Sequence, residues 1–275
     1  MSWTPRRVIL ALLVIASPSM ALANHSWGGY HWARTSNPFT LKTGDNVDSN
    51  WQSYFDAALS DWTSSSVLNL TAVTGTSNKH CSAVAGTIQV CNGRYGNNGW
   101  LGLASISITG GTHITQGTVK VNDTYFDTAT YNNPNERRHV MCQEIGHTFG
   151  LDHQSTDGSS QDTCMDYFSN TGANAGSTLS TRPNAHDYDE LVTIYTHLDS
   201  STTVKSAAVM PPAMEDLVLD GPGQWGREIE RSEDGSTSTF ELDFGHGNKI
   251  LTFVNWADGG QADVEDRSGP RDPAK

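Results

Sequence analysis

The chain is poor in positive charge, with 17 lysine and arginine residues against 30 aspartate and glutamate residues and a formal net charge of −13. A surface of that sign repels phosphate backbones and anionic headgroups, so we expect neither a nucleic acid nor a membrane as partner. The sequence also lacks any apolar run near the roughly 20 residues that a membrane-spanning helix needs.

The N-terminus has the composition of an export signal. A basic start precedes a short apolar run at residues 8–16, and Ala21-Leu22-Ala23 supplies a small-x-small ending. This pattern predicts a secretory signal peptide over residues 1–23 and a soluble mature protein that is secreted to the extracellular space.

Cysteine is scarce as well: there are four, with no Cys-x-x-Cys spacing that would suggest metal binding. In an oxidising compartment four cysteines predict two disulfides, with three possible pairings. We favour Cys81–Cys91 and Cys142–Cys164. The second pair would join the residue before Gln143 to the residue before Met165 and so limit the freedom of the segments between them.

Residues 143–153 read Gln-Glu-Ile-Gly-His-Thr-Phe-Gly-Leu-Asp-His and carry the clearest chemical signal. Residues four apart share one face of a helix, so Gln143 and His147 can reach one small cation. Glu144 then lies beside that cation, where it can take a proton from a metal-bound water. After a glycine turn His153 reaches the same ion, which predicts a catalytic zinc site with an open position.

This segment matches the extended zinc-peptidase signature H-E-x-x-H-x-x-G-x-x-H, except that Gln143 replaces the first histidine. Downstream, Cys164-Met165-Asp166-Tyr167 resembles the methionine turn that accompanies the signature. Together the two segments resemble the metzincin clan of zinc endopeptidases, and within it the matrixin-like secreted enzymes. The resemblance spans residues 24–200. It implies that Glu144 is the general base and that Tyr167 stabilises the tetrahedral intermediate.

The glutamine leaves three interpretations of the metal site open. Gln143 is a weak third ligand beside His147 and His153, because an amide oxygen is a poorer zinc donor than imidazole. Alternatively, the two histidines hold zinc with water or another carboxylate, or the site holds no useful metal. His139 lies eight residues before His147, about 12 Å along a helix, so we expect it outside the ligand set.

The resemblance implies an α+β fold, with a twisted, mostly parallel sheet, an antiparallel edge strand, an N-terminal helix, an active-site helix, the methionine turn and a C-terminal helix. An apolar stripe from Trp51 to Trp62, with a cap at Asp48 or Ser49, predicts the first helix. Asn133-Pro134, with Glu136 completing a capping box, predicts the start of the active-site helix. The strands are expected at 67–73, 87–90, 100–108 and 118–121.

The stretch 100–108 includes, by similarity to matrixins, the edge strand that bounds the substrate cleft. Its free backbone groups would pair with an extended peptide. No cysteine precedes Cys81 and no inhibitory propeptide is recognisable, so latency would need another route.

The last helix is expected to start near Pro183 and to bury Leu191, Ile194, Tyr195 and Leu198. We expect its other aromatic and histidine side chains to be packing or surface residues. These are His186, Tyr188 and His197.

Composition changes after residue 200. We expect a linker at 201–222, a small β-rich appendage at 223–257 and a disordered tail at 258–275. Three strands at 224–232, 237–244 and 249–256 would make this appendage a β-meander.

The sequence therefore predicts a secreted zinc-dependent endopeptidase that acts on a protein or peptide substrate, monomeric by default and without an organic cofactor. The alternative is a catalytically impaired pseudopeptidase that binds peptide or metal. A third possibility places the function in the meander, with Trp225 and Trp256 binding cell wall or carbohydrate.

Overall fold

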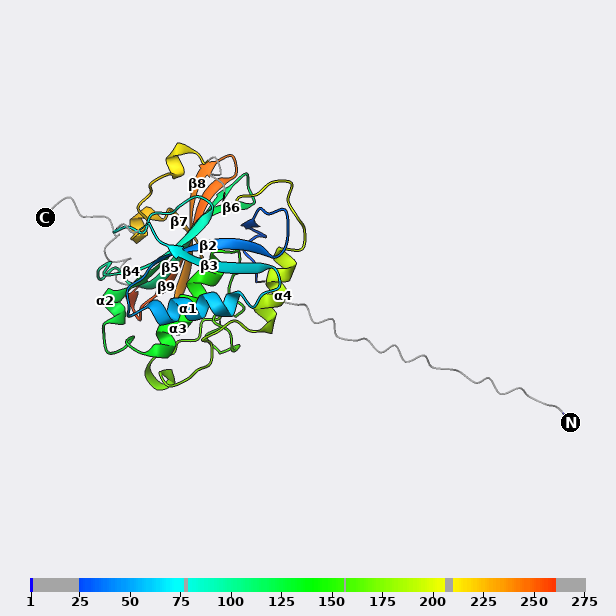
Figure 1. Ribbon diagram of the computed structural model, residues 1–275. Helices are drawn as coiled ribbons and strands as arrows, with labels where there is room; N and C mark the ends of the chain where they lie inside the picture. The colour runs from blue at the N-terminus through cyan, green and yellow to red at the C-terminus, as the bar shows by residue number, and fades with distance from the viewer. Residues whose placement is uncertain (2–24, 77–78, 156, 206–209, 261–275) are drawn as a thin grey trace.

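The computed structural model describes residue 1 and residues 25–76, 79–155, 157–205 and 210–260 (Figure 1). The predicted signal peptide and most of the predicted tail lie outside these residues. Within the described residues, no helix has the length and apolar character needed to cross a membrane.

One nine-stranded sheet organises the described chain, in the order β3-β2-β4-β6-β5-β9-β8-β7, with β1 beside β6. Strands β2, β3, β4 and β6 run parallel, whereas β5, β9, β8 and β7 follow in antiparallel pairs. The fold is thus mixed α/β with both kinds of strand pairing. The strands are β1 (His31–Trp32), β2 (Phe39–Asn46), β3 (Leu68–Thr74), β4 (Thr87–Gly93), β5 (Trp100–Thr109), β6 (His113–Asn122), β7 (Arg227–Arg231), β8 (Thr237–Gly245) and β9 (Asn248–Trp256).

Helices α1 and α3 pack together on one side of this sheet (Figure 1). Trp62 of α1 donates from its indole Nε1 to the carbonyl of Cys142 in α3 at 3.0 Å, which joins the two helices inside the core. The α-helices are α1 (Gln52–Trp62), α2 (Asp123–Phe126), α3 (Pro134–His147) and α4 (Ala185–Ile194), and the 3-10 turns are η1 (Gly172–Asn174), η2 (Pro212–Met214) and η3 (Pro222–Gln224).

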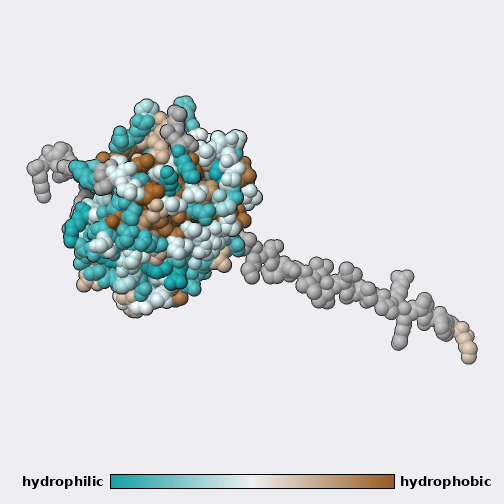
Figure 2. All heavy atoms as spheres, in the orientation of Figure 1, coloured by the Kyte–Doolittle hydropathy of each residue, from teal (hydrophilic) through white to brown (hydrophobic). Residues whose placement is uncertain are grey.

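Two hydrophobic clusters cover the two faces of the sheet. The larger one lies between the sheet and the helices. The smaller one lies under residues 214–225 on the other face and includes Met214, Leu219 and Trp225. On the side shown in Figure 2, the surface is mostly polar with smaller apolar areas between, as the acidic composition leads us to expect.

Helix α3 begins and ends as the sequence predicts. The Asn133 side chain accepts from the backbone N–H of Glu136 at 2.9 Å, and Pro134 occupies the first turn. The expected capping box is incomplete, because the Glu136 carboxylate instead accepts from the N–H of Asn170 at 2.7 Å. Past His147 the chain turns at Gly150, whose φ of +101° and contact with the Tyr30 carbonyl exclude a side chain.

Both favoured disulfides are present. Cys81 bonds to Cys91, and Cys142 bonds to Cys164. The second bond joins α3 to the turn that contains Met165, as the sequence predicts. Two disulfides are typical of proteins that fold in an oxidising compartment.

Most predicted elements are confirmed within a few residues of their ends. Strands β1 and β2 were not predicted. Helix α1 begins at Gln52, and the expected cap is found at Asp48, whose side chain accepts from the N–H of Asn50 at 2.8 Å and whose carbonyl accepts from the N–H of Gln52 at 3.0 Å. One detail is wrong: Leu198 lies beyond the end of α4 with 54% of its surface exposed.

The prediction that 100–108 is an edge strand is also wrong. Strand β9 pairs antiparallel with β5 from Trp100 opposite Trp256 to Ile108 opposite Lys249. The Ser105 and Thr252 hydroxyls, which face each other across this pair, lie 2.9 Å apart. The three strands predicted for the meander do form, but they continue the central sheet and occupy the edge that was expected to be free.

Candidate active site

The structure brings His147 and His153 together. His147 is the last residue of α3, and the Gly150 turn returns the chain so that the two imidazole centroids lie 4.6 Å apart at 71°. Both side chains are buried. The predicted geometry of helix, glycine turn and second histidine is therefore present.

Each histidine has a ring nitrogen suited to a metal. The Nδ1 of His147 lies 2.9 Å from the carbonyl of Leu151, which can only accept, so Nδ1 carries the proton and Nε2 keeps its lone pair. Burial lowers the pKa of His147 well below its usual value and keeps the ring neutral. The Nε2 of His153 is buried without a hydrogen-bond partner among the described residues.

Glu144 is also buried, on α3 directly after Gln143. Its Oε2 has no hydrogen-bond partner among the described residues. Burial raises the pKa of this carboxyl well above its usual value, because a carboxylate loses hydration energy in an apolar interior. A raised pKa makes the ionised carboxylate a stronger base, which suits a proton acceptor.

The amide of Gln143 is engaged at both ends. Its Nε2 donates to the carbonyl of Asp166 at 2.8 Å, which fixes the orientation of the amide. Its Oε1 accepts from Asn255 Nδ2 at 2.9 Å and keeps one further lone pair. His139 is buried with its Nε2 3.4 Å from Gln143 Nε2, so it is a neighbour of the glutamine.

The turn that contains Met165 lies beneath α3. A Cβ on Gly146 would lie only 2.6 Å from the sulfur of Met165, so the helix and the turn are in close contact there. Two residues on, the Tyr167 ring packs edge-on against His153 with centroids 4.3 Å apart. Burial raises the pKa of the Tyr167 hydroxyl, which keeps its proton and makes a hydrogen bond with Thr237.

Strands β8 and β9 cover this site, a contact that the sequence did not reveal. The Phe253 ring stacks on His147 with centroids 3.8 Å apart and also contacts Trp27. Phe253 also contacts His153, Asn255 binds Gln143, and Thr237 binds Tyr167, so the meander touches four of the five predicted site residues. The sequence of β9 predicts a strand, but nothing in it indicates which strand it pairs with.

The side chains present fit a zinc ion. The two imidazole rings lie close together, neither Nε2 atom is bonded to the backbone, and Glu144, three residues before His147 on the helix, has a carboxyl oxygen without a partner among the described residues. Buried polar atoms without partners are costly unless an ion or water satisfies them. A cavity of about 50 Å³, lined by Gln143, Tyr167 and His139 but not by the two histidines of the site, adjoins them on the Gln143 side.

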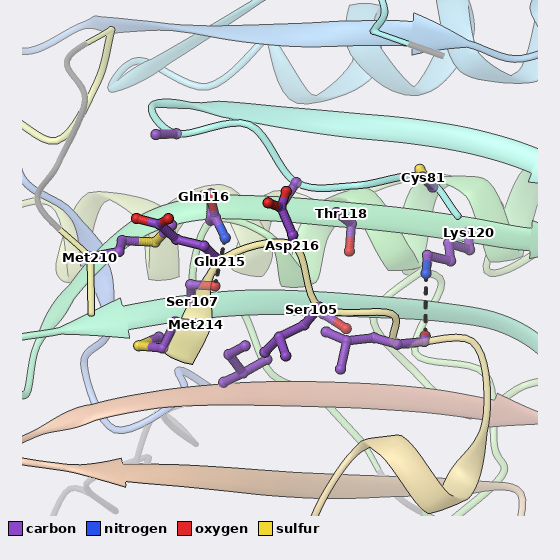
Figure 3. Close-up of a pocket in the computed structure, with 15 residues that line it drawn as sticks. Cys81, Ser105, Ser107, Gln116, Thr118, Lys120, Met210, Met214, Glu215 and Asp216 are labelled. Atoms are coloured by element: carbon purple, nitrogen blue, oxygen red, sulfur yellow. Dashed lines mark hydrogen bonds between the residues drawn. The ribbon is translucent and has the colours of Figure 1, made fainter. Parts of the chain in front are cut away.

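A larger pocket of about 290 Å³ lies on the opposite face of the sheet and contains none of the predicted site residues (Figure 3). Ser107, Gln116 and Lys120 project into it from β5 and β6, and Gln116 donates to Ser107 at 3.1 Å. The tryptophans proposed to bind carbohydrate are buried, Trp225 at 1% and Trp256 at 5% exposure, so they offer no binding surface in this structure.

No family model matches the chain, and no curated protein matches it in sequence. Among solved structures it is similar to high choriolytic enzyme 1 of the medaka fish Oryzias latipes, a hatching enzyme zinc-protease. The identity is 11%, the alignment covers 60% of this chain and 94% of that chain, and the TM-score is 0.32. At that score the likeness adds no weight to the proposals below, which rest on the chain's own residues.

Proposed function

We propose that the chain is a secreted zinc-dependent endopeptidase with a metzincin-like catalytic domain over residues 24–200. The observation that carries this proposal is the close approach of the buried His147 and His153 rings, whose centroids lie 4.6 Å apart, with Glu144 buried on the same helix as His147. Two of their polar atoms, Glu144 Oε2 and His153 Nε2, have no partner among the described residues. Protein or peptide substrates and export by a signal peptide belong to the same proposal.

His147 and His153 would hold the zinc ion, with the amide oxygen of Gln143 as a weaker third ligand. When bound, zinc polarises the scissile carbonyl and lowers the pKa of a bound water. Glu144 takes the proton of the attacking water and then delivers it to the leaving amine. Tyr167, kept protonated by burial, donates to the developing oxyanion.

Catalysis on a protein requires that β9 move away from β5. In the present arrangement Phe253 covers His147, and Glu144 is only 1% exposed, so no peptide bond reaches the site. The structure thus corresponds to a closed form of the proposed enzyme. The backbone groups of β5 that β9 now uses are those that an extended substrate would need.

The covered site and the engagement of the Gln143 amide at both ends favour a second candidate, a pseudopeptidase that binds metal without turnover. In that case the meander is a permanent part of the sheet, and Glu144 has no proton to transfer.

Cleavage of an unfolded protein by the zinc-loaded mature chain tests the two candidates. Glu144→Gln should lower the rate by about 100-fold or more while zinc content stays the same, because the base is lost and the ligands remain. Glu233→Gln, an exposed carboxylate, is the matched control. If the folded, zinc-loaded chain and its opened variant Phe253→Ala both leave the substrate intact, the pseudopeptidase is the correct function.

A further inference from the structure

A second cluster of metal-binding side chains lies at the end of the sheet, away from the active site. Three segments that are distant in sequence form it: His31 comes from β1, His113 is the first residue of β6, and His197 and Asp199 follow α4. The N-terminal segment and α4 lie next to each other in Figure 1. We propose that these four residues bind a structural zinc ion.

The separations of the ligand atoms suit one small cation. His31 Nε2 lies 3.1 Å from His197 Nε2 and 3.5 Å from Asp199 Oδ1. His197 Nε2 lies 3.7 Å from the same oxygen. Ligand atoms about 2 Å from a tetrahedral zinc are roughly 3.3 Å from each other, so these three donors need little movement to share an ion.

His113 approaches the same carboxylate from β6. Its Nε2 lies 3.2 Å from Asp199 Oδ1, and its ring packs edge-on against His31 with centroids 5.2 Å apart. Its ring nitrogen is not yet within 4.8 Å of all three other donors, so His113 supplies the fourth ligand after a rotation of its side chain. Three imidazoles and one carboxylate form a zinc donor set, and four protein ligands make a closed site of the structural kind.

The outer contacts orient the ligands toward the centre of the cluster. His31 Nδ1 lies 2.7 Å from the carbonyl of Gly29, so the proton stays on Nδ1 and the Nε2 lone pair faces the cluster. Arg34 donates two hydrogen bonds to the other oxygen of Asp199, Oδ2. One comes from its side-chain Nη1 at 2.9 Å and one from its backbone N–H at 3.1 Å. This leaves Oδ1 for the three histidines.

A bound ion would tie the start of the domain to its end. His31 and Asp199 are 2% and 9% exposed, whereas His113 and His197 are 34% and 57% exposed, so an ion has an open approach from solvent. The competing account is a metal-free hydrogen-bonded cluster in which His113 and His197 donate protons to Asp199 and His31. The proposal predicts one zinc ion bound at this cluster, whereas the competing account predicts none.

The test measures zinc binding in a chain that lacks the proposed catalytic ligands, His147→Ala/His153→Ala, so that its outcome does not depend on the proposed function. This chain should still bind one equivalent of zinc after chelation and refilling. Adding His197→Ala, an exposed position where folding is least at risk, should weaken that binding by about 100-fold or more. His246→Asn, an exposed histidine in a turn, should leave it unchanged.

A second measurement tests the proposal even if the double variant fails to fold. In the chain with intact catalytic residues, His197→Ala alone should remove one equivalent of zinc. Asp199→Asn alone should remove the same equivalent. Zinc stoichiometry and affinity that are the same with and without these substitutions would overturn the proposal and leave the hydrogen-bonded cluster as the account.

Discussion

Gln143 combines two roles that are usually separate. Its amide bonds to the turn through Asp166 and to β9 through Asn255, so it links the active-site helix to two other segments. An imidazole at this position would be a better zinc ligand but would present different donors and acceptors to Asp166 and Asn255. In the proposed enzyme, the glutamine would be a weaker zinc ligand that also joins the site to the strand covering it.

Gln143→His should tighten zinc binding at the His147–His153 site by roughly 10- to 100-fold, because imidazole replaces an amide oxygen as donor. Competition with a chromophoric chelator measures the affinity, with the exposed Gln161→His as control. An unchanged affinity would mean that residue 143 does not contact the ion.

Asp187 gives the fold a pH dependence that is independent of any metal. It closes the capping box of α4, where it accepts from the backbone N–H of Asn184 at 2.7 Å and from the Thr163 hydroxyl. Burial raises the pKa of this carboxyl to about 6. Between about pH 4 and 6 the folded chain thus holds a proton that the unfolded chain releases, so stability falls as pH rises through this range.

The loss should approach about 3 kcal/mol in the free energy of unfolding. Asp187→Asn should flatten the dependence between pH 4 and 6, as measured by urea unfolding at fixed pH. Asp189→Asn, an exposed carboxylate on the same helix, should preserve the slope. Equal slopes in all three proteins would show that another group is responsible.

The Cys142–Cys164 bond connects α3 to the turn beneath it, whereas Cys81–Cys91 lies remote from the site. The sequence separations are 22 and 10 residues, so loss of either bond by paired Cys→Ala changes should cost about 3 kcal/mol of unfolding free energy. Only loss of Cys142–Cys164 should speed zinc release to a chelator, because it frees the ligand-bearing segments. Equal release rates in both variants would show that the bond does not position the ligands.

The sequence predicts what depends on neighbours along the chain. Asn133-Pro134 predicts the start of α3, and Gly150 predicts the turn after it. Together the helix and the turn predict that His147 and His153 meet. What it does not predict is pairing between distant segments. The largely apolar run of β9 predicts a strand without naming its neighbour, and its partner is decided by packing of Phe253 and Val254 on opposite faces of the sheet.

The histidine cluster was not predicted either, because its residues are far apart in the sequence. His197 was expected to be a packing or surface residue, and its exposure fits that expectation. Its nearness to His31 depends on β1 lying beside β6 and on the path of the chain after α4. No spacing motif marks such a site, since its ligands come from both ends of the domain.

The meander and the catalytic half of the sheet form one folded unit, and this explains why the site is closed. Phe253→Ala removes the ring that covers His147 and should raise peptide cleavage at least about 10-fold, at a stability cost of about 3 kcal/mol. Val254→Ala, on the opposite face of the same strand, is the matched control. If both variants gain activity equally, general loosening rather than opening of the site is the cause.

The pairing of β5 with β9 also sets an order of events during synthesis. Ser105 and Thr252, which face each other in the finished sheet, are 147 positions apart in the chain. The active-site helix and the turn after it are therefore made before their cover, and β5 has an unpaired edge until the C-terminal strands emerge. A newly made chain thus passes through a stage in which the site can form while still uncovered, and completion of the chain closes it.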